Sequence, residues 1–349
     1  MADGSNSYGI SMDEYSAPTI KRLLQMDYIA GIEMASSNYI DSRSEILDFS
    51  KLVMYSRFYK KFNESIYVEL CKTDMVRSWN RANPASLISE DKQMKEDVLK
   101  KIISSSADNM KTINTLIMSP VKQMINNDAA LLPGEKNVQL LFSEKLLSSL
   151  HPIVWFVLLQ FFEQKDYFKI IHFIADNINS FLKKNSIPEY FALMFMELLA
   201  LTENTKLKNY ASKELGKDYN MDQILADDSI RKMLMLKTKN DNIYVSWKIK
   251  SFHTNQTSGF EQMEVTIYNR DSKYRALKEK IDVKKDLNLK EKSLTEFYTQ
   301  SQDGPGNELG LFYISYLDEA CRKVDMRFES NVNFIGHDDL TVINLRMLI

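Results

Sequence analysis

The spacing of apolar residues divides the chain into a long helical part and a shorter part that contains strands. From Thr19 to about Ser119, apolar side chains recur every three to four positions, which predicts a series of amphipathic helices ending before Pro120. A turn at residues 132–135 follows, because proline next to glycine interrupts a helix. The helical spacing then resumes in three helices over about residues 143–204.

Beyond Gly216 the apolar residues alternate with polar ones instead. Residues 243–250 and 263–268 alternate in this way, which predicts two half-buried strands that pair antiparallel. One more helix and two more strands are predicted at about residues 311–324, 326–332 and 340–348. The sequence therefore predicts an α+β fold, in which an all-helical N-terminal module precedes a two-layer α/β sandwich on a mostly antiparallel sheet.

These patterns define three segments. Residues 1–18 are polar and are expected to be disordered. Residues 19–133 are expected to form the helical module, and residues 134–349 the sandwich domain. The boundary is placed at the turn over residues 132–135, which is the strongest interruption of the helical pattern.

The composition excludes several classes of protein. The chain has 45 basic and 47 acidic side chains, so no overall positive charge would drive nucleic-acid binding. Cys71 and Cys321 are too few for a disulfide framework or a four-cysteine zinc site, and the four histidines show no metal-ligand spacing. The most apolar run, residues 153–162, is shorter than the roughly 20 residues of a membrane span. We therefore expect a reduced, cytoplasmic protein with no membrane span.

Glycines are scarce in this chain, and three of them lie close together near the C-terminus. The chain holds 10 glycines in 349 residues, where about 7% is typical, and this scarcity favours helices. Gly304, Gly306 and Gly310 lie within seven residues at the start of the last predicted helix. Backbone N–H groups at such a place can point at phosphate oxygens. A solvent-exposed turn before a helix explains the same residues equally well.

The C-terminal part combines a buried helix, a strand pair, a glycine-rich loop and a second helix in a distinctive order. Glu197 is the only charge inside the apolar helix core at 191–201. Residues 308–315 read ELGLFYIS, residues 326–330 read MRFES, and residues 341–345 read TVINL. This order resembles the ATP-binding domain of the histidine-kinase and heat-shock-ninety ATPase superfamily, the GHKL or Bergerat fold. The resemblance covers about residues 140–349 and implies a site for ATP with magnesium.

The resemblance implies a magnesium ligand that this chain lacks. In the family, the buried helix carries Glu-x-x-x-Asn, in which the asparagine binds magnesium and the glutamate orients water. Glu197 is present here, but Leu201 stands at the asparagine position, and a hydrocarbon cannot ligate a hard cation. Asn204 is nearby, about 300° round the helix from Leu201 at 100° per residue. Glu197 can equally be a structural acid with a partner.

The adenine-binding motif is also altered. The family's aspartate lies in Asp-x-Gly-x-Gly after the second strand, where this chain has Asn269-Arg270-Asp271-Ser272-Lys273 without glycines. Asp271 could accept from an adenine amino group, and it is also a common turn residue. The candidate nucleotide-binding residues are thus Glu197, Asn204, Asn269, Asp271, Gly304, Gly306 and Gly310.

These departures predict a non-catalytic bacterial signalling or scaffold protein, a pseudokinase that needs no cofactor and works through protein–protein contacts. One alternative is an active GHKL kinase or ATPase, with Glu197 as the catalytic residue and with ATP and magnesium held by Glu197 and either Asn204 or Asp271. A second alternative is a structural adaptor whose helical half carries the function. We expect protein partners and no nucleic acid, and a homodimer through the helical module remains open.

Overall fold

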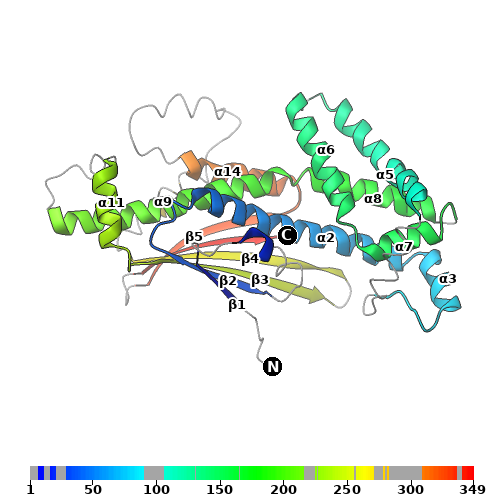
Figure 1. Ribbon diagram of the computed structural model, residues 1–349, viewed down its shortest axis with the longest axis horizontal. Coiled ribbons are helices and arrows are strands. Elements are labelled where there is room, and N and C mark those ends of the chain that lie inside the picture. Colours follow the sequence, from blue (N-terminus) through cyan, green and yellow to red (C-terminus); the bar gives the residue numbers. More distant parts are fainter. Residues whose placement is uncertain are drawn as a thin grey trace. The chain divides into compact units, whose positions relative to one another are not determined.

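The computed structural model divides the chain into two compact units (Figure 1). One unit combines Met1–Ser56 with Ser186–Ile349 and is called the sheet unit below; the other, Arg57–Asn185, is called the helical unit. The helical unit is therefore an insertion in the sequence of the sheet unit. The structure describes residues 7–11, 16–20, 29–89, 106–129, 131–164, 166–215, 225, 227–254, 257–270, 278–279, 281–282, 309–335 and 340–349.

The sheet unit is built on six described strands in the order β1-β2-β3-β4-β6-β5. β1 and β2 are parallel, and every other neighbouring pair is antiparallel. The strands are β1 (Ser7–Ser11), β2 (Gly31–Ser36), β3 (Ile243–Thr254), β4 (Thr257–Arg270), β5 (Arg327–Ile335) and β6 (Leu340–Leu348).

One face of this sheet is apolar because alternate residues of each strand point to the same side. Trp247 of β3 is fully buried there and meets three phenylalanine rings edge-on. The ring centroids of Phe49, Phe191 and Phe195 lie 5.3, 5.6 and 5.2 Å from that of Trp247. These rings belong to helices α2 (Arg43–Cys71) and α9 (Ser186–Leu215), so both helices cover this face.

The strand registers fix the directions of the helices over the sheet. Ser36 pairs with Ile243, and we call this end of the sheet the Ser36 end. α9 reaches the Ser36 end with its second half, since Glu203 bonds the backbone of Tyr39 and Ile40. α14 (Leu309–Arg322) ends just before β5, which begins at the opposite end of the sheet. α14 therefore runs away from the Ser36 end, antiparallel to α9, alongside which it packs (Figure 1). Its Tyr313 and Tyr316 meet Tyr190 near the start of α9, so the first described turn of α14 lies short of the Ser36 end.

The helical unit holds the rest of α2 and five further described helices. Phe58 and Phe62 of α2 pack against Phe181, with ring centroids 6.4 and 5.5 Å away. Pro133 opens α6, and the Leu132 N–H donates to the Glu135 carboxylate at 2.8 Å. The helices are α3 (Asp74–Ala82), α5 (Ala107–Asn127), α6 (Pro133–Ser148), α7 (Pro152–Gln160) and α8 (Tyr167–Leu182).

The α+β fold class is confirmed, but several local predictions are wrong, among them the turn over residues 132–135, which is the first turn of α6. α5 continues through Pro120 to Asn127, because Ile117, Val121 and Ile125 bury one face at helical spacing and outweigh the bond that proline loses. Ser7–Ser11 is a strand within the segment expected to be disordered. β2 also lies where the apolar spacing predicted helix.

The domain boundary also falls elsewhere than residues 133/134. The chain leaves the sheet unit after Ser56 and returns to it at Ser186. The reason is packing: β2 pairs with β3, while α6 and α8 of the predicted second domain pack with α5. No single helix of the described residues is long and apolar enough to cross a membrane; α6 and α7 reach that length and composition only together, bent by 79°.

Candidate functional site

The fold brings the described candidate residues toward one end of the sheet. Asn269 is the last but one residue of β4 and pairs with Thr341 at the Ser36 end. Gly310 is the second residue of α14, which runs away from that end, and Asn204 lies in the half of α9 that reaches it. Glu197 lies about two turns before Asn204 on α9 and is half-buried. Asp271, Gly304 and Gly306 lie outside the described residues.

The fully buried acid of α9 is Glu203, which the sequence did not single out. Its side chain has no exposed surface. One carboxylate oxygen accepts the backbone N–H groups of Tyr39 and Ile40 at 2.8 and 3.0 Å, and the other accepts from the Arg231 guanidinium at 2.7 Å. Burial raises the pKa of Glu203, and the Ile40 N–H and the Arg231 charge oppose that shift. Glu203 therefore ties α9 to the loop after β2.

Two basic side chains complete this buried group. Arg231 comes from α11 (Asp228–Lys237), and its second guanidinium nitrogen donates to the Asn204 side-chain oxygen at 2.8 Å. The Lys206 ammonium donates to the carbonyls of Ser37 and Asp241 at 2.8 and 3.0 Å. Burial lowers the pKa of Lys206. We call Glu203, Asn204, Lys206 and Arg231 the α9 charge cluster.

The α9 charge cluster does not fit a magnesium ion. Mg²⁺ needs oxygen ligands in an octahedral arrangement. The Asn204 oxygen already accepts from a guanidinium, whose positive charge repels a cation, and Leu201 supplies no oxygen. Across the described ranges, no group of three or more histidine, cysteine, aspartate or glutamate side chains could hold a metal ion. The cluster is instead arranged to fasten the loop after β2 and α11 to α9.

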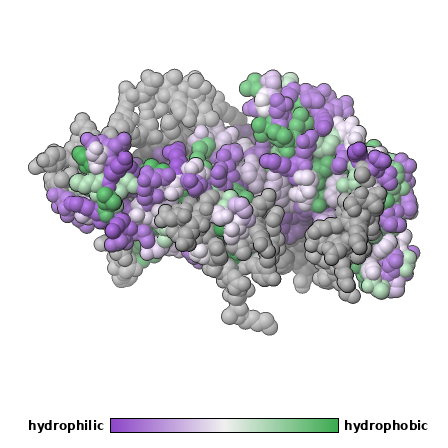
Figure 2. Space-filling model, in the orientation of Figure 1, coloured by the Kyte–Doolittle hydropathy of each residue, from purple (hydrophilic) through white to green (hydrophobic). Residues whose placement is uncertain are grey.

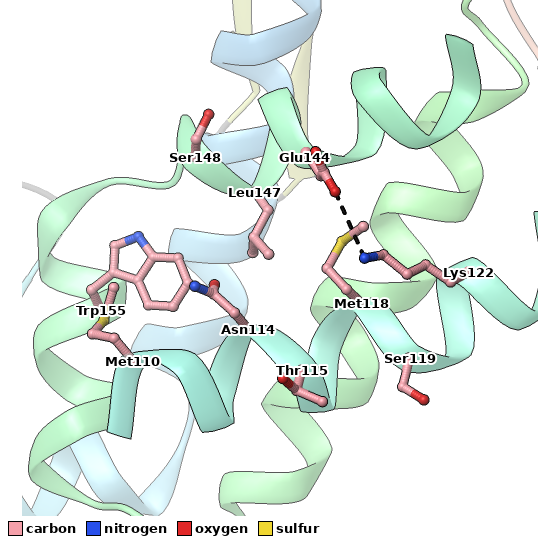
Figure 3. Close-up of a pocket in the computed structure, with 10 residues that line it drawn as sticks. All are labelled: Met110, Asn114, Thr115, Met118, Ser119, Lys122, Glu144, Leu147, Ser148 and Trp155. Atoms are coloured by element: carbon pink, nitrogen blue, oxygen red, sulfur yellow. Dashed lines mark ion pairs between the residues drawn. The ribbon is translucent and has the colours of Figure 1, made fainter. Parts of the chain in front are cut away.

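The helical unit contains a pocket of about 700 Å³ between α5, α6 and α7 (Figure 3). Met110, Met118, Leu147 and Trp155 supply its apolar lining. On one side of the pocket the Lys122 ammonium and the Glu144 carboxylate lie 3.7 Å apart. The Asn114 side chain lies between these features and points toward the Trp155 ring (Figure 3). A volume of this size is within the range of small-molecule sites.

The hairpin formed by α5 and α6 also carries an exposed apolar strip. Met124, Leu132, Val138 and Leu141 are 41, 67, 53 and 60% exposed. Figure 2 shows hydrophobic surface over α6, among otherwise polar side chains. Single exposed apolar residues are ordinary, whereas several close together indicate a contact surface. We call these four residues the hairpin strip.

The sequence contained only weak signals for these features. The segment 202–208, TENTKLK, has the composition of a solvated helix end, and nothing local marks Glu203 as buried. Its partners Tyr39 and Arg231 are 164 and 28 residues away in the sequence. The pocket likewise joins residues of three helices. A buried acid whose partners are distant in the sequence can be recognised only from the folded structure.

Comparisons with known proteins place the whole chain in one family without assigning a function. A model described as a family of unknown function, DUF8084, matches residues 1–349. An uncharacterized protein of Treponema pallidum (strain Nichols) is 27% identical over 348 residues, which cover 99% of this chain and 90% of that protein. No solved structure gives a significant match. Both matches extend across the sheet unit and the helical unit.

Proposed function

Since the chain belongs to DUF8084, a family of unknown function, we propose its role from the site itself: a non-catalytic scaffold or signalling protein that works through protein contacts. In this proposal the sheet unit is a degenerate ATP-binding domain of the GHKL type. It has lost the magnesium ligand and needs no cofactor. The protein acts in the cytoplasm, in keeping with two cysteines that form no disulfide.

The order and placement of elements support the GHKL resemblance. α9 is followed by the β3–β4 hairpin, and α14 is followed by the β5–β6 pair. β4 ends at the Ser36 end of the sheet, and α14 runs away from that end. This order of elements is the one that the resemblance implies.

The hydrogen bond between Arg231 and Asn204 is the main support for the proposal that the protein is non-catalytic. Asn204 is the candidate magnesium ligand nearest to Leu201 in the sequence, and its oxygen accepts from a guanidinium at 2.8 Å. Arg231 is in turn held by the buried Glu203. A Mg²⁺ ion at the Asn204 oxygen would have to displace this guanidinium, and that would break its bonds with both Asn204 and Glu203.

Isothermal titration of the full chain with ATP and magnesium tests this proposal. We expect no magnesium-dependent binding in the micromolar range. We also expect the same background phosphate release from wild type and Glu197→Gln. Micromolar, magnesium-dependent binding, or phosphate release that Glu197→Gln abolishes, would establish the alternative of an active GHKL kinase or ATPase.

The hairpin strip favours a second candidate function, an adaptor whose helical unit carries the protein contacts. Val138 and Leu141 lie one turn apart on α6 and are more than half exposed. The partner is either another protein or a second copy of this chain. Light scattering coupled to size exclusion distinguishes the two: a dimer of wild type that the double variant Val138→Ser, Leu141→Ser dissociates supports the homodimer.

If wild type and the double variant Val138→Ser, Leu141→Ser are both monomers, the expected partner is another protein. Immobilised wild type should then retain a partner from source lysate that the double variant loses. The double variant Lys145→Ser, Lys136→Ser, on the same helix, is the matched control, and it should retain that partner. Equal capture by wild type and the strip variant removes the helical-adaptor candidate.

A further inference from the structure

The pocket between α5, α6 and α7 has an amide group at its centre. Asn114 projects from α5 toward the Trp155 ring (Figure 3). Its carboxamide offers one acceptor oxygen and two N–H donors. Within the described part of the chain, no side chain or backbone group forms a hydrogen bond with it. A half-buried amide in this position can therefore recognise a donor and an acceptor that lie side by side.

The lining around this amide favours a flat apolar body. Met110, Met118 and Leu147 face the pocket together with the Trp155 indole (Figure 3). Methionine thioethers and an indole ring make favourable contacts with aromatic rings. Trp155 and Leu147 are 7 and 5% exposed, so they form the fixed floor of the pocket rather than its rim.

The charges at the pocket select against an ionised ligand. The Lys122 ammonium and Glu144 carboxylate are 3.7 Å apart, and both side chains line the pocket. A charged ligand in the pocket would meet both members of this ion pair, so the attraction to one is offset by repulsion from the other. An anion that approached Lys122 would also meet Glu144.

We propose that this pocket binds an uncharged, planar aromatic molecule with a lactam-like edge, in which an N–H and a C=O lie side by side. The ring system packs against Trp155, Met118 and Leu147. The edge forms paired hydrogen bonds with the Asn114 carboxamide. The pocket lies within the helical unit, so this inference does not depend on the proposed function of the sheet unit.

Binding of isoquinolin-1(2H)-one to the full chain tests the proposal, with calorimetry or ligand-observed NMR as the measurement. This probe is a neutral bicyclic lactam. Its N-methyl derivative lacks the edge donor, and 2-naphthoate carries a negative charge. We expect saturable binding of the lactam. The N-methyl derivative should bind about tenfold more weakly, since one hydrogen bond in a pocket corresponds to roughly that factor. 2-Naphthoate should also bind more weakly than the lactam, because its carboxylate meets Glu144.

Variants of pocket residues assign the binding to this site. Asn114→Leu should weaken lactam binding about tenfold and remove the preference over the N-methyl derivative. Asn126→Leu, on the same helix but outside the pocket, is the matched control and should bind as wild type. Glu144→Gln leaves Lys122 unopposed, so it should strengthen 2-naphthoate binding and leave lactam binding unchanged.

Circular dichroism and thermal unfolding establish that each variant is folded. Absence of saturable lactam binding to wild type would overturn the proposal. So would an Asn114→Leu protein that is folded and keeps both the wild-type affinity and the wild-type preference. Neither result bears on nucleotide binding by the sheet unit, which the ATP titration measures separately.

Discussion

At the scale of single residues, Glu203 shows how a buried charge is accommodated. A carboxylate without exposed surface is costly unless charge and hydrogen bonds compensate for lost water. Here two backbone N–H groups and a guanidinium do so. The same contacts join segments that are far apart in the sequence. We therefore assign the α9 charge cluster a role in holding the Ser36 end together rather than in binding a cation.

Replacing Glu203 tests this role. Glu203→Gln leaves the Arg231 guanidinium without its buried anion, so we expect the free energy of unfolding to fall by about 3 kcal/mol in urea denaturation. Glu214→Gln, on the same helix, removes a pair with Lys237 in which both side chains are 46% exposed, and it should cost at most about 1 kcal/mol. Equal effects of the two variants would contradict the assigned role.

The pH dependence of stability should reflect Glu264 on β4. The hydrogen bond from Asn344, together with nearby Lys250, lowers the pKa of Glu264 below its ordinary value of 4.5. A carboxyl whose pKa is lower in the folded state stabilises above its unfolded pKa, and this contribution is lost as the pH falls. The gap in melting temperature between wild type and Glu264→Gln should therefore narrow between pH 6 and pH 3. A constant gap would exclude this contribution.

At the scale of elements, the sheet unit depends on the packing of α2 and α9 against the apolar face of the sheet. α9 is apolar nearly all round in its first half because it packs against both the sheet and α14. Tyr190 of α9 meets Tyr313 and Tyr316 of α14, with ring centroids 5.8 Å away in both cases. The helices thereby form one layer over the sheet.

Trp247 provides a test of this layer. Trp247→Ala removes the ring that Phe49, Phe191 and Phe195 surround, so we expect a loss of about 3–5 kcal/mol in the free energy of unfolding. The indole N–H is buried with no acceptor among the described residues. Trp247→Phe keeps an aromatic ring and removes this donor, so it should cost far less than Trp247→Ala. A similar loss in both variants would contradict the assignment of the stability to the aromatic packing.

At the scale of the whole molecule, the helical unit is an insertion between two parts of the sheet unit. The strand β2 precedes the insertion in the sequence, and its partner β3 follows it. β2 therefore waits for about 200 further residues to be synthesised before its partner is available, and such long-range pairing is slow to form. The helical unit has its own aromatic core around Phe58, Phe62 and Phe181.

This division predicts which fragments fold. Residues 57–185 contain the second half of α2 and the five further described helices of the helical unit, so this fragment should be helical by circular dichroism and should unfold cooperatively. Residues 19–133 lack α6, α7 and α8 and carry β2 without its partner β3, so this fragment should show no cooperative transition. Cooperative unfolding of residues 19–133 would instead support a boundary at the 132–135 turn.

The sequence alone determined the fold class and the strands of the C-terminal half. Alternation in residues 243–250 and 263–268 identified β3 and β4, because a half-buried strand imposes a period of two on its own residues. The turn that the sequence predicted over residues 132–135 is instead the first turn of α6, which begins at Pro133. Of the candidate site, it named Asn204 and Asn269, and the fold directs both to one end of the sheet.

Tertiary structure alone decided the division into units, the strand β2 and the α9 charge cluster. β2 has six residues and takes its partner from more than 200 residues further on, so no local period distinguished it from the helices around it. Glu203 and Arg231 lie in segments with the composition of solvated helices. Their burial depends on which elements come to lie over α9. The pairing of β2 with β3 and of Glu203 with Arg231 depends on how the whole chain packs. The periodicity of a sequence shows only which face of a single helix or strand is buried.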